Sequence, residues 1–143
     1  MISAYDPNEG DSRTEKLKAI DQKLACVRHA IDDARRRYGG EIEVLICSDI
    51  NRHHSLWGGG NVARRRKTEG APIVHLAQEF GQQSMLPAGT ITWQHVGKEL
   101  SSTIDVILAS AGLADRLVRC CVHEHDHGSD HRPIETDFDV PAP

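Results

Sequence analysis

The most regular hydrophobic pattern in the chain lies between residues 12 and 40. Ser12 can cap a helix there, with Glu15 as its capping-box partner, and Gly39 and Gly40 can end it. Apolar side chains in between recur at alternating spacings of three and four, at Leu17, Ile20, Leu24, Val27, Ile31, Ala34 and Tyr38. This spacing predicts an amphipathic helix that faces a core rather than a coiled coil, because the run is short and strand-like segments follow it.

Shorter apolar runs predict strands. Residues 42–47 and 103–109 are nearly continuous apolar runs, which is typical of strands buried on both faces. A second helix is predicted over residues 73–80, and the polar, glycine-rich and basic residues 51–70 are predicted to form a long loop. Further strands are predicted at residues 2–5, 83–86, 90–94, 117–122 and 134–140.

Short turns between these strands, together with two main helices, indicate an α/β (α+β) fold, a layered sandwich with a mixed β-sheet. The 143 residues suit one domain that spans residues 1–143. Two helices on one face leave the other face of the sheet uncovered. Since residues 42–47 and 103–109 are apolar on both sides, we expect something outside this chain to cover that face.

Composition excludes several classes of protein. Hydrophobic residues make up 38% of the chain, and no apolar run approaches the ~20 residues of a membrane span, so no membrane partner is expected. The net charge of −4 excludes a strongly basic nucleic-acid coat protein but allows an enzyme that meets nucleic acid through a local patch. The first ten residues show no secretory signal, which favours an intracellular protein.

The cysteines also favour an intracellular protein. Cys26, Cys47, Cys120 and Cys121 form no C-x-x-C pair and are interpreted as buried, reduced thiols. The histidine-rich segment 120–127 could bind zinc, but its alternating histidines lack a standard zinc spacing.

Most of the candidate catalytic and metal-binding residues lie at the ends of predicted strands. Asp49 and Asn51 follow a buried strand, so both side chains can project from one edge into a cleft, and Asp130 and His131 come just before another strand. Asp105 interrupts an apolar strand, where an unpaired carboxylate would cost several kcal/mol, so a partner such as a histidine ring is expected. Turn caps and ordinary hydrogen-bonded polar residues are the alternative interpretation of each residue taken alone.

These residues belong to several segments that occur in a family-specific order. The segments are Tyr5-Asp6-Pro7-Asn8, Asp49-Ile50-Asn51, Thr92-Trp93, Ser102-Thr103-Ile104-Asp105 and Ser129-Asp130-His131-Arg132-Pro133. In this order the chain resembles the endonuclease/exonuclease/phosphatase (DNase I-like) superfamily. Residues 51–59 and 102–110 further resemble the endonuclease domain of non-LTR retrotransposons, which lies upstream of a reverse transcriptase.

The resemblance implies a DNA-nicking endonuclease that hydrolyses phosphodiester bonds with Mg²⁺ or Mn²⁺. Asp49 would activate the attacking water and, with Asp130, bind the metal. Asn51 would orient that water, His131 would contact the scissile phosphate, and Asp105 would orient His131.

Further residues would contact DNA. Tyr5 would take part in catalysis from the opposite rim, where Asn8 would also contact phosphate. The other implied phosphate or DNA contacts are Arg52, Trp93, Arg64, Arg65 and Arg66. A nuclear location follows from this function and from the basic run 64–67, which could also be an ordinary solvated loop.

The chain also departs from the family pattern. It matches only the second half of the four-layer fold, lacks a counterpart of the metal-binding glutamate, and has Ser48 where a glycine is usual. Expected partners besides DNA are therefore the missing N-terminal half, a downstream reverse transcriptase, or a second copy in a homodimer. Two alternative functions stay open: an inactive half-domain that binds or dimerises, and a phosphatase of the same fold.

Overall fold

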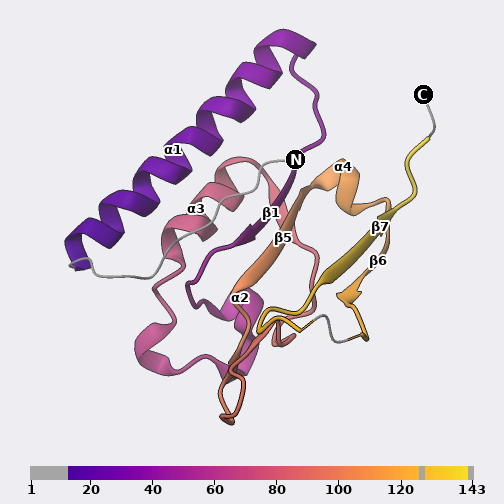
Figure 1. Ribbon diagram of the computed structural model, residues 1–143. Coiled ribbons are helices and arrows are strands. Elements are labelled where there is room, and N and C mark those ends of the chain that lie inside the picture. Colours follow the sequence, from indigo (N-terminus) through magenta and orange to yellow (C-terminus); the bar gives the residue numbers. More distant parts are fainter. Residues whose placement is uncertain (1–12, 126–127, 142–143) are drawn as a thin grey trace.

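A computed structural model describes residues 13–125 and 128–141 of the chain (Figure 1). The predicted strand at residues 2–5 and the Ser12 cap lie outside these residues. The elements are α1 (Arg13–Tyr38), β1 (Leu45–Asp49), α2 (Ser55–Gly58), the 3₁₀ helices η1 (Gly59–Asn61) and η2 (Arg64–Arg66), α3 (Ala71–Glu79), β2 (Gln82–Ser84), β3 (Trp93–Gln94), β4 (Ser101–Ser102), β5 (Asp105–Ser110), α4 (Ala111–Ala114), β6 (Leu117–Val122) and β7 (Ile134–Phe138).

The main sheet has the strand order β1-β5-β2, and the pairs β3-β4 and β6-β7 form two smaller sheets. All these pairings are antiparallel, so the parallel part of the predicted mixed sheet is not found among the described strands. The reason is the position of β5. It lies between β1 and β2, which run in the same direction and would otherwise pair in parallel.

The helices α1 and α3 cover one face of the main sheet (Figure 1). Side chains spaced by three and four on α1 pack with alternate residues of β1 and β5, and the buried set is Ile20, Leu24, Val27, Ile31, Ile46, Val106 and Leu108. The predicted core-facing helix is therefore confirmed. The second predicted helix is also present, and it begins two residues earlier because Pro72 suits its first turn.

The opposite face of the sheet is partly covered by the chain itself. Ile107 is only 5% exposed and Ala109 is fully buried, although neither belongs to the cluster under the helices. Cys47 and Ile107 of this face line a hollow of about 450 Å³ together with Ile134 and Thr136 of β7. The expectation that only something outside the chain covers this face is therefore wrong in part, because the β6–β7 hairpin folds beside β5 (Figure 1).

The segment 51–70 is more ordered than the predicted loop. It contains α2, η1 and η2, and its centre is Trp57, which is 1% exposed and donates its indole N–H to the carbonyl of Arg52 at 3.1 Å. His54 caps α2 by accepting the N–H of Leu56 at Nδ1, 3.0 Å away. Elements of three or four residues have no measurable hydrophobic period, which is why α2 and α4 were not predicted.

The cysteine prediction needs one correction. All four cysteines are free thiols, and Cys47, Cys120 and Cys121 are partly buried, but Cys26 is exposed. Cys26 lies on the outer side of α1, away from the stripe formed by Leu24 and Val27. No helix within the described residues combines the length and apolar character that crossing a bilayer requires.

Candidate active site

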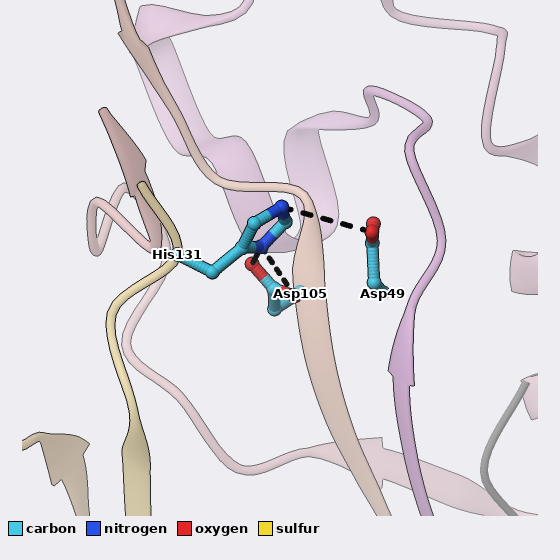
Figure 2. Close-up of side chains that lie close together, drawn as sticks. All are labelled: Asp49, Asp105 and His131. Atoms are coloured by element: carbon cyan, nitrogen blue, oxygen red, sulfur yellow. Dashed lines mark hydrogen bonds and ion pairs between the residues drawn. The ribbon is translucent and has the colours of Figure 1, made fainter. Parts of the chain in front are cut away.

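Two carboxylates meet because of the register between β1 and β5. Asp49, the last residue of β1, is paired directly with Asp105, the first residue of β5. His131 reaches them from the loop before β7, and one nitrogen of its ring faces each carboxylate (Figure 2). One potential metal-ligand atom from each of the three residues, a ring nitrogen or a carboxylate oxygen, lies within 4.8 Å of the other two. The structure thus brings together residues that are 82 positions apart in sequence, from 49 to 131.

The expected contact between Asp105 and His131 is present. His131 Nδ1 lies 3.2 Å from Oδ1 and 3.1 Å from Oδ2 of Asp105. A carboxylate can only accept, so Nδ1–H is the donor, and the contact fixes both the orientation and the tautomer of the ring. The other ring nitrogen, Nε2, points toward Asp49 at 3.8 Å from Oδ2, which is too long for a hydrogen bond.

Asn51 is held beside this pair in a conformation that few residues adopt. Its φ of 44° lies in the left-handed region, which asparagine tolerates better than most side chains. The backbone N–H of Asn51 donates to Asp49 Oδ1 at 3.0 Å, so the same carboxylate that faces His131 also fixes this turn. Unusual backbone conformations of this kind concentrate at functional sites.

Asp130 is placed differently from Asp49 and Asp105. Its side chain is exposed and accepts the indole N–H of Trp93 at Oδ2, 2.9 Å away. This hydrogen bond is the main reason why the pKa of Asp130 lies below its ordinary value, and the neighbouring His131 lowers it further. Asp130 does not belong to the close group formed by Asp49, Asp105 and His131.

A groove of about 620 Å³ opens next to His131. We call it the His131 groove, and the polar and aromatic residues that line it include Asn51, His53, Asn61, Arg66, Trp93 and His131. His53 was not singled out from the sequence, because nothing in the run 51–59 separates its direction from that of His54. Its burial, followed by the charge of Arg66, lowers the pKa of His53, against an opposing effect of Glu69.

The four arginines predicted to contact DNA differ in their placement, and of these Arg66 lines the groove. Arg66 lines the groove and forms an ion pair with Glu69 at 2.9 Å, while Arg64 and Arg65 are exposed on η2. Arg52 is half-buried and donates to the carbonyl of Asn51 at 3.0 Å. Tyr5 and Asn8 lie outside the described residues.

The zinc interpretation of the histidine-rich segment receives no support in the described part of the chain. The rings of His123 and His125 lie 5.1 Å apart, but there they join no group of three potential ligands.

Comparison with known proteins identifies the family. Residues 1–135 match the family described as endonuclease-reverse transcriptase, and the chain belongs to that family. The predicted resemblance is therefore confirmed. No curated protein is similar enough to match the chain.

Solved structures show the same fold. The endonuclease domain of TRAS1, a telomere-specific non-LTR retrotransposon, is 19% identical with a TM-score of 0.66, and the match covers 86% of this chain and 53% of that one. An AP endonuclease from Archaeoglobus fulgidus is 20% identical with a TM-score of 0.69, and the match covers 96% of this chain and 60% of that one. A 3′-5′ exonuclease from Neisseria meningitidis is 21% identical with a TM-score of 0.61, and the match covers 91% of this chain and 56% of that one.

These similarities confirm the predicted fold class, a layered α/β fold of the DNase I-like type. The chain spans little more than half the length of the solved chains that it matches.

Proposed function

We propose that the site around His131 hydrolyses phosphodiester bonds and nicks DNA. The observation that carries the proposal is an imidazole that faces two carboxylates, with Nδ1 hydrogen-bonded to Asp105 and Nε2 directed toward Asp49. Family membership and the nuclease folds of the similar structures support the same reaction class.

Each residue of the site would have its own part in the reaction. Asp49 would accept the proton of the attacking water, and the N–H of Asn51, which donates to Asp49 Oδ1, would keep the carboxylate in position. The Asn51 amide would orient that water from the edge of the groove. His131 Nε2 would contact a non-bridging phosphate oxygen and stabilise its developing charge, while Asp105 keeps the ring in place.

The site offers carboxylates, which suit a hard divalent cation by ligand type, although Asp130 lies outside the close group of Asp49, Asp105 and His131. Asp49 and Asp130 would hold Mg²⁺ or Mn²⁺ through carboxylate oxygens, the ligands that these hard cations prefer. When bound, the cation would neutralise charge on the phosphate. Two carboxylates are a small ligand set, so Mg²⁺ is expected to bind no more tightly than about millimolar.

DNA would lie along the His131 groove. Arg64 and Arg65 are exposed on η2, while the neighbouring Arg66 lines the groove, so the basic run can follow a phosphate backbone without reading base sequence. Arg52 and Trp93 would contact the substrate closer to His131. Tyr5 and Asn8 would approach from the part of the chain outside the described residues, and a nuclear location remains part of this proposal.

A plasmid-nicking assay tests the proposal. With Mg²⁺ the chain is expected to convert supercoiled plasmid slowly to the open circle, and excess EDTA is expected to stop the conversion. Asn51→Ala is expected to lower the rate by about tenfold to a hundredfold, because it removes one positioned polar group. Gln78→Ala, which deletes an exposed carboxamide on α3, serves as the matched control. Nicking that survives EDTA, or that Asn51→Ala leaves unchanged, would contradict the assignment.

A phosphatase is the second candidate reaction. One similar structure is described as a 3′ phosphatase from Neisseria bound to product DNA hairpin, with a TM-score of 0.61 and 20% identity. Release of inorganic phosphate from a 3′-phosphorylated oligonucleotide, without cleavage of an unmodified one, would favour this reaction over nicking.

The third candidate is a non-catalytic module that dimerises. The hollow beside Cys47 and Thr136 favours it, because a second copy could fill the space that the β6–β7 hairpin leaves open. We expect light scattering at micromolar concentration to find a homodimer of about twice 15.8 kDa. A stable species at 15.8 kDa would show that the β6–β7 hairpin alone closes this face.

A further inference from the structure

Thr92 lies where two parts of the site are joined. Its side chain is completely buried, and its hydroxyl oxygen accepts the backbone N–H groups of Ile104 and Asp105, each at 3.1 Å. These two residues mark the point at which β5 begins. The hydroxyl therefore fixes the backbone that carries the Asp105 carboxylate.

The backbone around Thr92 fixes the partner of that carboxylate. The carbonyl of Thr92 accepts the N–H of Arg132 at 2.7 Å, and the N–H of Gln94 donates to the carbonyl of Asp130 at 2.8 Å. The two bonds flank His131, which forms an isolated antiparallel bridge with Trp93. One short segment, residues 92–94, thus holds both Asp105 and His131.

We infer that Thr92 is a positioning residue, whose hydroxyl sets the geometry between the Asp105 carboxylate and His131 Nδ1. The inference rests on the proposed function, because this geometry affects a reaction only if His131 meets the substrate. The physical basis is that a buried N–H needs an acceptor. An apolar side chain of the same shape would leave the N–H groups of Ile104 and Asp105 without one, so the start of β5 would shift until they found another.

Three variants separate the hydroxyl from the rest of the side chain. Thr92→Val keeps the shape and removes the hydroxyl, whereas Thr92→Ser keeps the hydroxyl and removes the methyl group. Thr90→Val is the matched control, because the Thr90 hydroxyl donates to the carbonyl of Pro87 within its own turn, at 2.7 Å. The first readout is the ¹⁵N NMR spectrum of the His131 ring in the full chain, which reports the tautomer and does not depend on activity.

In the wild-type chain we expect the Nδ1–H tautomer of His131. Thr92→Val is expected to give a mixture of tautomers, whereas Thr92→Ser and Thr90→Val keep the wild-type spectrum. The second readout is nicking, where Thr92→Val is expected to lower kcat by on the order of 10- to 100-fold with KM little changed, and Thr92→Ser restores kcat.

A folded Thr92→Val protein with the wild-type His131 spectrum would overturn the inference, whether or not the chain nicks DNA. If Thr92→Val does not fold, Thr92→Cys takes its place, because a thiol is a weak acceptor. An unchanged spectrum in Thr92→Cys would likewise overturn the inference. Absence of nicking in the wild-type chain, with the expected change of tautomer, would instead contradict only the proposed function.

Discussion

Replacing His131 by alanine or Asp105 by asparagine is expected to lower the rate of DNA nicking by about 100-fold to 10,000-fold while the fold stays intact. His131→Ala removes the only imidazole that lies against both Asp49 and Asp105 in the described part of the chain. Asp105→Asn keeps the shape of the side chain but offers Nδ1 an amide in place of a carboxylate, so the ring loses its fixed tautomer and orientation.

The measurement is the conversion of supercoiled plasmid to the open circle, with the variant protein in excess over the plasmid. A single cut converts each circle, so slow nicking is visible under these conditions. His29→Ala, which removes an exposed histidine on α1, is the control and is expected to nick at the wild-type rate. Circular dichroism shows whether each variant is folded. Wild-type nicking by either folded site variant would place the reaction elsewhere on the molecule.

The parts of the fold that depend on local pattern could be predicted from the sequence. The three-and-four spacing from Ile20 to Ile31 predicted the buried face of α1, and the run 117–122 predicted β6 with its observed bounds. The bounds of β1 were less accurate. Val44 was assigned to the strand, but its N–H donates to the Ser110 hydroxyl, and the ladder begins only at Leu45.

The parts that depend on distant segments could not be predicted. The sequence placed Asp49 and Asp105 on two different strands, but only the antiparallel register makes them direct neighbours. Their position beside His131 was expected from the family resemblance and from Asp105, a carboxylate that interrupts an apolar strand. The spacing of these residues in the sequence did not predict it. Thr92 was part of a recognised Thr-Trp pair, yet its importance rests on hydrogen bonds to residues 12 and 13 positions away.

Replacing Trp57 by alanine is expected to lower the free energy of unfolding by about 3–5 kcal/mol. Trp57 is 1% exposed, and its ring packs so closely on Gly70 that a side-chain carbon at that glycine would overlap it. The backbone around the ring is also engaged, because the carbonyl of Trp57 accepts the N–H of Gly89 at 2.7 Å. Truncation would leave a cavity in the segment that joins β1 to α3.

Urea unfolding of Trp57→Ala, followed by circular dichroism, gives the size of this effect. Leu56→Ala is the matched control, because Leu56 is the preceding residue on α2 but is 43% exposed, and its truncation is expected to change the free energy of unfolding by less than about 1 kcal/mol. Equal losses in both variants would contradict the role of Trp57 as the anchor of this segment.

The nicking reaction is expected to respond to Trp57→Ala as well. The Trp57 indole holds the carbonyl of Arg52, the residue after Asn51, so Trp57→Ala is expected to loosen the turn that Asp49 and Asn51 share. A nicking rate that falls with Trp57→Ala under conditions where the variant is still folded would show that this buried ring supports the site as well as the fold.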